Sequence, residues 1–419
     1  MKKVLEKISK EIIPSKQEQR QVNEVSQEIL SLINSKAEKF QARLIIGGSV
    51  AKGTWLPGIH DIDCFLQFDY EKYKNKSEQI SDLAEKIVRV CFKNYQRLHG
   101  SRDYFQTNYL GYDIEIIPVL RLTKPDRMKN ITDVSPLHFV WLSKKTKKLK
   151  LKNDIRIAKK FFKSANCYGA ESFIRGFSGH VIEILIVHFG GFINLLKQIN
   201  RWGDKIIVDP EQRYMDEKQL MLLMNESKLT SPIIVVDPIQ PERNAAAIVS
   251  EEKFKIIKQA AKKFLAKPST NSFVEKKITA TQIKARKTKN KLILFSVKPN
   301  KEVTMDVAGC QILKQFEYIE RLLNEYDFKI VKKNWFWDKH NDAILWFYIN
   351  PTILSAQFRH QGPPAELKEH ANAFRKQWKK FAVKTSNGKL YVDFPRKIRT
   401  VDAVVKELKK DTNLNIRIL

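Results

Sequence analysis

The sequence predicts an α+β protein built from more than one domain, and three observations support this. Hydrophobic residues recur with helical spacing in long segments, and short apolar runs typical of strands lie between them. A polar break at residues 266–273 (AKPSTNSF) is followed by a different order of elements. The chain has 419 residues, which is enough for two to four domains, each with its own hydrophobic core.

The elements before the polar break alternate between helix and strand. Apolar residues recur every three or four positions over residues 1–40, which predicts helix. Residues 81–98 and 153–189 have the same period, and Asn153 is the expected N-cap of the later segment. Short apolar runs predict three strands: RLIIGGS (43–49), DIDCFLQF (61–68) and YDIEIIPVL (112–120).

The elements after the break predict a smaller sheet. A strand at 292–297, a helix at 309–326 and strands at 328–337 and 343–349 follow in this order. Strand, helix, strand, strand is the order found in ferredoxin-like domains, in which a helix covers a small sheet. Residues 381–394 (FAVKTSNGKLYVDF) predict a hairpin, because Asn-Gly favours a tight turn between strands.

The charge balance favours a polyanionic partner. Lys and Arg number 76 against 46 Asp and Glu, a formal net charge of +30. Nucleic acid is expected before a membrane, because no lipid-anchor motif or basic amphipathic anchor is apparent. The four cysteines form no CxxC pair, which argues against a zinc site or disulfide frame and suggests a reducing cytoplasm.

Two segments that resemble targeting or membrane sequences are expected to be neither. The N-terminus MKKVLEKISKE carries charges where a signal peptide needs an apolar core. The most apolar run, HVIEILIVHFGGFINLL from His180, is interrupted by Glu183 and His188. This run therefore predicts a buried helix and no membrane span.

Two aspartates in the predicted strand 61–68 suggest a metal site. Asp61 and Asp63 are two residues apart in a strand, so their side chains point to the same face. Parallel carboxylates repel each other unless a cation lies between them, and hard oxygen ligands favour Mg²⁺. A solvated polar strand face is the alternative, and it is the commoner fate of an Asp-X-Asp pattern taken alone.

The residues around these aspartates favour phosphate chemistry. Gly47–Gly48–Ser49 ends a strand, and the next residues can begin a helix whose free backbone N–H groups hold a phosphate. Lys52 lies one turn further on, where its ammonium can reach a triphosphate. Glu115 is a third acid in an apolar strand, where an isolated buried charge would be costly. A phosphate site beside three acids fits two-metal phosphoryl transfer.

This combination resembles the polymerase-beta-type nucleotidyltransferases, whose motif is hG[GS], then Dh[DE]h, then a distal carboxylate. Further blocks, in order and over most of the chain, resemble the archaeal, class I CCA-adding enzymes. These blocks are residues 48–66, 115–120, 135–138, 156–192, 237–247 and 360–378.

The resemblance implies a fold and an activity. It implies an α+β multidomain chain with a polymerase-beta-type catalytic palm (1–134), a helical central nucleotide-binding domain (135–267), and a ferredoxin-like body with a tail that binds tRNA (268–419). The implied activity is template-independent addition of C, C and A to the 3′ end of tRNA from CTP and ATP, with two metal ions and pyrophosphate release. A poly(A) polymerase-like template-free nucleotidyltransferase is the nearest alternative, and a non-catalytic RNA-binding protein on an inactive core is a more distant one.

The resemblance also assigns the acids. Asp61, Asp63 and Glu115 would be the catalytic residues that hold Mg²⁺. The family usually has Asp at the position of Glu115, and Asp113 on the same strand face stays open as an alternative for the third acid.

Seven further residues are implied to bind the nucleotide: Gly48, Ser49, Lys52, His138, Lys159, Tyr168 and Arg243. Arg243 matches the family's arginine that reads the Watson–Crick edge of the base. From the residues alone, Lys159 could be a surface lysine, Tyr168 or His138 a packed core residue, and Arg243 a residue at a helix start. His180 takes no role, because the family more often has Tyr there.

The expected partners follow from the same reasoning. The basic stretches 144–152 and 276–291 are expected to contact phosphates of tRNA, at its acceptor arm and 3′ end. CTP and ATP are the expected substrates, no membrane is involved, and the resemblance allows a homodimer. The expected location is the cytoplasm.

Overall fold

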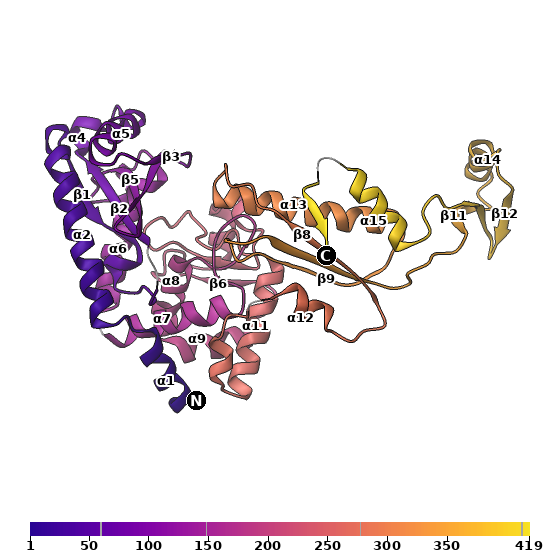
Figure 1. Ribbon diagram of the computed structural model, residues 1–419, viewed down its shortest axis with the longest axis horizontal. Helices are drawn as coiled ribbons and strands as arrows, with labels where there is room; N and C mark the ends of the chain where they lie inside the picture. The colour runs from indigo at the N-terminus through magenta and orange to yellow at the C-terminus, as the bar shows by residue number, and fades with distance from the viewer. Residues whose placement is uncertain (59–60, 148, 277, 412–413) are drawn as a thin grey trace. The chain divides into compact units, whose positions relative to one another are not determined.

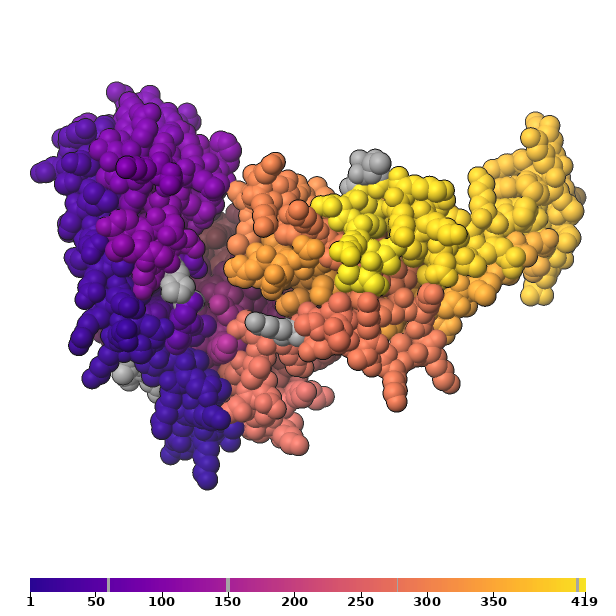
Figure 2. Space-filling view, in the orientation of Figure 1, coloured from indigo at the N-terminus to yellow at the C-terminus, as the bar shows by residue number. Residues whose placement is uncertain are grey.

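The chain divides into two compact units, residues 1–276 and 277–419. The computed structural model describes residues 1–58, 61–147, 149–276, 278–411 and 414–419. Figure 1 traces the elements of each unit, and Figure 2 distinguishes the units by colour, indigo to salmon for the first and orange to yellow for the second.

The first unit begins with a five-stranded sheet that is covered on one face by helices. Its strand order is β1-β2-β5-β4-β3, and β2 and β5 run parallel at the centre. The strands are β1 (Ala42–Ile46), β2 (Asp61–Phe68), β3 (Gln96–Leu98), β4 (Tyr104–Tyr109) and β5 (Tyr112–Leu120). The covering helices are α2 (Lys16–Ala37) and α5 (Ile80–Cys91), and short helices α3 (Gly48–Lys52) and α4 (Tyr70–Tyr73) flank β2.

The alternation of buried and exposed side chains along β2 shows which face of this sheet carries the candidate catalytic acids. Ile62, Cys64 and Leu66 are at most 1% exposed and pack against α2 and α5. Because successive strand residues point to opposite faces, Asp61 and Asp63 lie on the face away from these helices. The three predicted strands of this part are confirmed.

Two helices predicted within residues 1–98 differ from those in the structure. The helical stretch 1–40 is broken after α1 (Lys2–Ile12), and Ser15 caps α2 through a capping box with Glu18. The helix predicted over 81–98 ends at Cys91, and the last residues form β3. β3 pairs with β4, a strand that was not predicted, so sheet pairing overrides the local helical pattern.

The rest of the first unit is mostly helical. Its helices are α6 (Ser135–Lys145), α7 (Leu149–Ser164), α8 (Gly179–Phe189), α9 (Phe192–Arg201), α10 (Glu217–Leu223) and α11 (Glu251–Ala266). A two-stranded parallel sheet joins β6 (Ile206–Val208) to β7 (Ile233–Val235). Helices α7, α8, α9 and α11 bury one shared core, whose aromatic centre is Phe161, Phe162, Phe192 and Phe264.

The single helix predicted over 153–189 is wrong in its middle. Residues 165–178 leave the helix, and Tyr168 pairs with Phe177 in an isolated parallel bridge. Gly169 has a φ of +121°, which a side chain would not tolerate easily. Asn153 is not the N-cap, because α7 begins at Leu149.

The apolar run at α8 and α9 is part of this core. Six consecutive residues of α8, from Val181 to Ile186, are buried. Among the described residues no single helix is long and apolar enough to cross a membrane. The pair α8 and α9 meets that condition only when taken together, and the two helices are bent by 94° at their junction.

The second unit contains the predicted ferredoxin-like sheet. Its elements are α12 (Ala280–Lys284), β8 (Lys291–Val297), α13 (Met305–Glu325), β9 (Ile330–Phe336), β10 (Ala343–Ile349), α15 (Val401–Lys410) and β14 (Ile416–Ile418). The sheet order β14-β8-β10-β9 is antiparallel throughout, which is the ferredoxin-like arrangement of strands 4, 1, 3 and 2.

A small tail is inserted between β10 and α15. It consists of β11 (Gln357–Pro364), α14 (Lys368–Gln377), β12 (Val383–Ser386) and β13 (Lys389–Pro395), with sheet order β11-β13-β12. The predicted hairpin is β12–β13, with Asn387 and Gly388 at its turn, both at positive φ. Ala371, Phe374, Leu390 and Val392 give the tail a core of its own.

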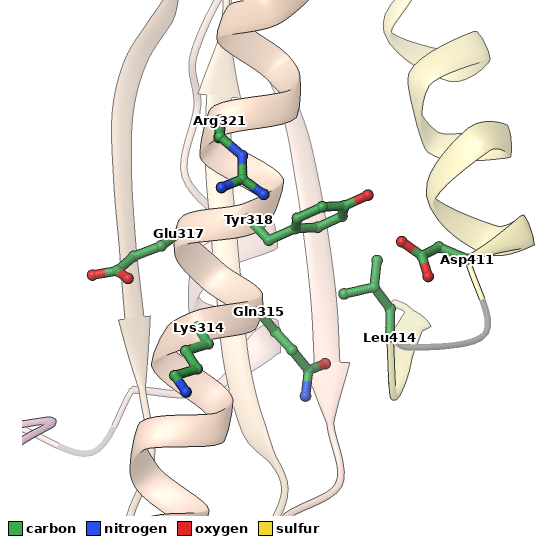
Figure 3. Close-up of a pocket in the computed structure, with 7 residues that line it drawn as sticks. All are labelled: Lys314, Gln315, Glu317, Tyr318, Arg321, Asp411 and Leu414. Carbon is green, nitrogen blue, oxygen red and sulfur yellow. The ribbon is translucent and has the colours of Figure 1, made fainter.

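A groove of about 620 Å³ lies on the second unit beside α13. Figure 3 shows Tyr318 pointing from α13 towards Asp411, while Lys314 and Arg321 lie on the same helix. A hydrogen bond to Asp411 raises the pKa of Tyr318. None of the predicted site residues lines this groove.

Candidate active site

The predicted acids come together at the centre of the first sheet. Asp61 and Asp63 lie on β2, and the parallel pairing sets Asp61 opposite Asp113 and Asp63 opposite Glu115. Paired residues of parallel strands point to the same face, so four carboxylates share one patch of the sheet. Asp63 and Glu115 are half-buried, whereas Asp61 and Asp113 are exposed. The residue directly across from Asp63 is therefore Glu115.

The electrostatics of these acids suit a cation. Burial, followed by the neighbouring charge of Asp61, raises the pKa of Asp63, while Lys52 and Lys159 act in the opposite direction. Burial, followed by the charge of Asp63, raises the pKa of Glu115 to about 7. Carboxylates that resist ionisation because they are desolvated and repel each other are stabilised when a divalent cation binds between them. The acids present therefore fit a metal site.

Side-chain amides donate hydrogen bonds to the two acids of β5. Asn108 Nδ2 donates to Asp113 Oδ1 at 2.9 Å, and Gln106 Nε2 donates to Glu115 Oε2 at 3.3 Å. Both donors come from β4, the strand that the sequence patterns did not predict.

The glycine loop lies directly against these acids. The N–H of Gly47 donates to the carbonyl of Asp63 at 2.7 Å, and Gly48 has a φ of +53°. A Cβ atom placed on Gly48 would lie 1.6 Å from Asp63 Oδ2. The glycines are needed because the start of α3 approaches β2 so closely that no side chain fits between them.

The two predicted phosphate-binding lysines contact the same buried carboxylate. Lys52 Nζ lies 2.7 Å from Glu183 Oε2, and Lys159 Nζ lies 3.1 Å from Glu183 Oε1. Thr54 Oγ1 is 3.2 Å from the same Oε1 atom. Lys159 is only 3% exposed, so it is no surface lysine. The two lysines lower the pKa of Glu183 to about 2, although burial opposes this.

Tyr168 lies near the same lysine. A Cβ atom on Gly179, the first residue of α8, would lie 3.1 Å from the Tyr168 hydroxyl and 3.6 Å from Lys159 Nζ. Burial, followed by the charge of Glu183, raises the pKa of Tyr168, so its hydroxyl stays protonated at neutral pH.

The remaining predicted residues, His138 and Arg243, gather around Asp237 together with His180, for which the sequence predicted no role. His138 Nε2 is 2.8 Å from Asp237 Oδ1, His180 Nε2 is 3.3 Å from Oδ2, and Arg243 Nη1 donates to Oδ2 at 3.1 Å. Backbone N–H groups of Ile239 and Gln240 also donate to Oδ1. No helix begins at Arg243, since the next helix is α11.

This cluster also offers three ligand atoms, one each from His138, His180 and Asp237, within 4.8 Å of one another. Burial opposes the ionisation of Asp237, but hydrogen bonds from both histidines outweigh it and hold its pKa far below the usual range. Burial lowers the pKa of His180 to about 4. Because histidines, an arginine and two backbone N–H groups already bond the carboxylate, hydrogen bonding accounts for this arrangement.

Four residues of the site were missed from the sequence: Glu183, Asp237, Thr54 and His180. Glu183 had a readable signal, because a lone acid in the apolar run HVIEILIVHF must find a cation when the helix is buried. Asp237 and Thr54 had none, since Asp237 meets His138 and Thr54 meets Lys159 across about a hundred positions of the chain.

The sheet, the acids and the glycine loop define a nucleotidyltransferase of the polymerase-beta type. Solved structures agree at the level of the fold. A cytoplasmic RNA terminal U-transferase gives a TM-score of 0.51 at 12% identity, covering 66% of this chain and 98% of that one. Cid1, an RNA terminal uridylyl transferase, gives 0.52 at 12% identity with the same coverage.

Family comparisons are more specific. Residues 153–274 match the second domain of tRNA nucleotidyltransferase, residues 286–415 match the C-terminal domain of the CCA-adding enzyme, and residues 1–148 match the Second Messenger Oligonucleotide or Dinucleotide Synthetase domain. The CCA-adding enzyme of Nanoarchaeum equitans is 32% identical over 91% of this chain and 90% of its own length. That of Methanosarcina mazei is 28% identical over 96% and 87%. The chain belongs to the CCA-adding enzymes, a family of nucleotidyltransferases, which generally use divalent metal ions.

Proposed function

We propose that this protein adds C, C and A to the 3′ end of tRNA without a template, using CTP and ATP and releasing pyrophosphate. The observation that carries the proposal is the placement of Asp63 opposite Glu115, directly beneath the glycine loop, in a chain of the CCA-adding family. Such an activity belongs to tRNA processing and RNA repair.

Asp61, Asp63 and Glu115 are the residues that would hold Mg²⁺. Oxygen ligands suit Mg²⁺, and its bound charge would activate the attacking 3′ hydroxyl and stabilise the leaving pyrophosphate. Glu115 takes the third place because it faces Asp63, while Asp113 faces the exposed Asp61.

The triphosphate would lie between the glycine loop and the lysines. Gly48 and Ser49 would contact the phosphates from the start of α3, where the Ser49 backbone N–H also donates to the Asp63 carboxylate. Lys52 and Lys159 supply positive charge beside Asp63. Tyr168, in the segment between α7 and α8, and His138, on α6, would contact the triphosphate and sugar. These assignments rest on the family resemblance, and the shared location of Lys52, Lys159 and Tyr168 supports them.

Arg243 would read the base. Its side chain is 37% exposed, and Asp237 fixes one nitrogen of its guanidinium, which leaves a planar fork held in one orientation. A guanidinium so held can donate to the ring acceptor that cytosine and adenine share on their Watson–Crick edges.

The tRNA would be bound through its phosphates. The excess of 30 positive charges, with basic stretches at 144–152 and 276–291, supports binding of the acceptor arm and 3′ end. We assign this task chiefly to the body and tail (268–419), and we assign nucleotide binding to the palm (1–134) and the central domain (135–267). A cytoplasmic location and a homodimer are further parts of the proposal.

The poly(A) polymerase-like alternative fits less well, because the match to the C-terminal domain of CCA-adding enzymes spans most of the second unit. The test is incubation with tRNA that lacks its 3′ CCA and with labelled CTP or ATP. Two cytidines and one adenosine should be added and then addition should stop. A continuing run of adenosines would refute CCA addition in favour of the alternative.

The metal ligands are tested in the same assay. Asp63→Ala and Asp61→Ala should lose activity by several orders of magnitude while retaining tRNA affinity, because only metal ligation is removed. Glu115→Gln should be severely impaired, and Asp113→Asn, its matched control on the same strand, should be mildly affected. If Asp113→Asn is the inactive variant, the third ligand is Asp113.

A further inference from the structure

Glu183 is a buried acid at the candidate active site. It lies in the middle of α8 and is 2% exposed. Its two oxygens contact two different lysines, Lys52 on α3 at 2.7 Å and Lys159 on α7 at 3.1 Å. One carboxylate thus connects the helix after the glycine loop to two helices of the central core.

The charges around Glu183 do not cancel. Two lysines contact one carboxylate, so one positive charge is in excess when both are in the ammonium form, and both lysines also act on Asp63. A surplus positive charge held beside a metal-binding acid is what an incoming triphosphate requires.

Lys159 depends on this carboxylate more than Lys52 does. Its side chain is 4% exposed, against 13% for Lys52, and its other hydrogen-bond partners are the carbonyl and hydroxyl oxygens of Thr54. A buried ammonium without a counter-charge loses its proton or moves to solvent. Burial lowers the pKa of Lys159, and the charge and hydrogen bond of Glu183 oppose that shift. Glu183 therefore favours the ammonium form of Lys159 and holds the side chain in place before any nucleotide binds.

We propose that Glu183 is a positioning residue for nucleotide binding, which holds Lys52 and Lys159 together as a charged pair aimed at the β- and γ-phosphates. The proposal rests on the proposed function. Glu183 itself does not touch the nucleotide. It acts by fixing two donors in advance, so that the binding energy of the triphosphate is not spent on ordering them.

The proposal predicts an effect that depends on the number of phosphates. Replacing Glu183 by Gln keeps its size but removes the charge, so the lysines are no longer held as a pair. CTP affinity should fall about ten- to a hundred-fold, the value of one or two charge-assisted hydrogen bonds. CMP lacks the two outer phosphates, so its affinity should change less than about threefold.

The measurement is equilibrium binding of labelled CTP and CMP in the presence of Mg²⁺, with tRNA affinity measured in parallel. The ratio of CTP to CMP affinity should collapse in E183Q, and tRNA affinity should be unchanged. Glu211→Gln is the matched control, because Glu211 also accepts from a lysine, Lys145 at 2.8 Å, and from Trp141 Nε1 at 2.7 Å, away from the acids. Its ratio should match that of the wild type.

Glu183→Asp provides a second test of the CTP-to-CMP affinity ratio, which does not require the Gln variant to fold. It keeps the charge but is one methylene shorter, so it can reach only one of the two lysines, and the ratio should fall by an intermediate amount. An unchanged or increased ratio in either folded variant would overturn the role of Glu183. A wild-type protein that binds CTP but adds no nucleotide to tRNA would instead count against the proposed function.

Discussion

Replacing Gly48 by alanine should inactivate the enzyme without unfolding it. The new Cβ atom would lie 1.6 Å from Asp63 Oδ2, 2.5 Å from its Cγ and 2.8 Å from its Cβ. Because even the Cβ of Asp63 is too close, rotating the carboxylate does not relieve the clash. Ordinary contact distances require the two groups to separate by about 2 Å.

The cost divides into two parts. The left-handed backbone of Gly48, with a φ of +53°, costs an alanine about 1–2 kcal/mol. The displacement falls on a proposed metal ligand, and a misplacement of about 1 Å at a reacting centre can cost on the order of 100-fold in rate. We therefore expect a loss of at least about 100-fold in CMP incorporation, with a modest loss of stability.

Gly111→Ala separates these two parts. Gly111 has a φ of +81° in the turn between β4 and β5, and nothing lies within 4 Å of the position its Cβ would take. It should show the backbone cost alone, with incorporation within about threefold of the wild type. Single-turnover incorporation into tRNA lacking CCA, with urea unfolding of both variants, makes the comparison. Equal incorporation by the two variants would refute the argument that the loop and Asp63 are in critical contact.

Three further predictions concern pH, base choice and the second unit. The pKa of His180 is lowered from 6.5 to about 4, so the unfolded chain binds a proton between these values that the folded chain does not, and stability falls as pH drops through this window. In His180→Gln the loss of unfolding free energy between pH 7 and pH 4.5, measured by urea titration, should be smaller by up to about 3 kcal/mol. An unchanged loss would show that another group titrates in this range. Arg243→Ala should reduce the preference for CTP over UTP by about ten- to a hundred-fold with little change in tRNA affinity, as single-nucleotide incorporation would show; an unchanged preference would move the search for the base reader to another residue. A fragment ending at Lys276 should bind CTP but lose most tRNA affinity, and binding by the full chain should weaken steeply with salt; equal tRNA affinity for both chains in filter binding would contradict the domain assignment.

The sequence allowed prediction of the fold wherever local pattern and tertiary pairing agree. The strands at 61–68 and 112–120 are apolar on the core side, so their periodicity was sufficient. β3 and β4 were missed because they are short and polar, and the pairing of β4 with β5 and of β3 with β4 stabilises them more than their own residues do.

The candidate site divides in the same way. Asp61 and Asp63 were predictable because strand alternation is a local rule, and Glu115 because a charge in an apolar strand is costly and matches the family's distal carboxylate. Their parallel pairing is a finding of the structure. The partners of the lysines were not, because Lys52 and Glu183 are 131 positions apart and only the packing of α8 brings them together. For the same reason, the sequence alone does not decide whether Lys159 is a surface lysine or a residue of the site.

The carboxylates of this site can be told apart by the direction in which their surroundings move their pKa values. Glu183, Asp63 and Glu115 all experience desolvation, which raises a pKa. In Glu183 two ammonium groups in direct contact reverse that effect, so its charge is already neutralised within the protein. In Asp63 and Glu115 neighbouring carboxylates add to it, and the same lysines act on Asp63 too weakly to reverse it. The acids that remain unfavourable to ionise are those that gain most from a bound cation, which is why we place the metal at Asp63 and Glu115 and give Glu183 the lysines.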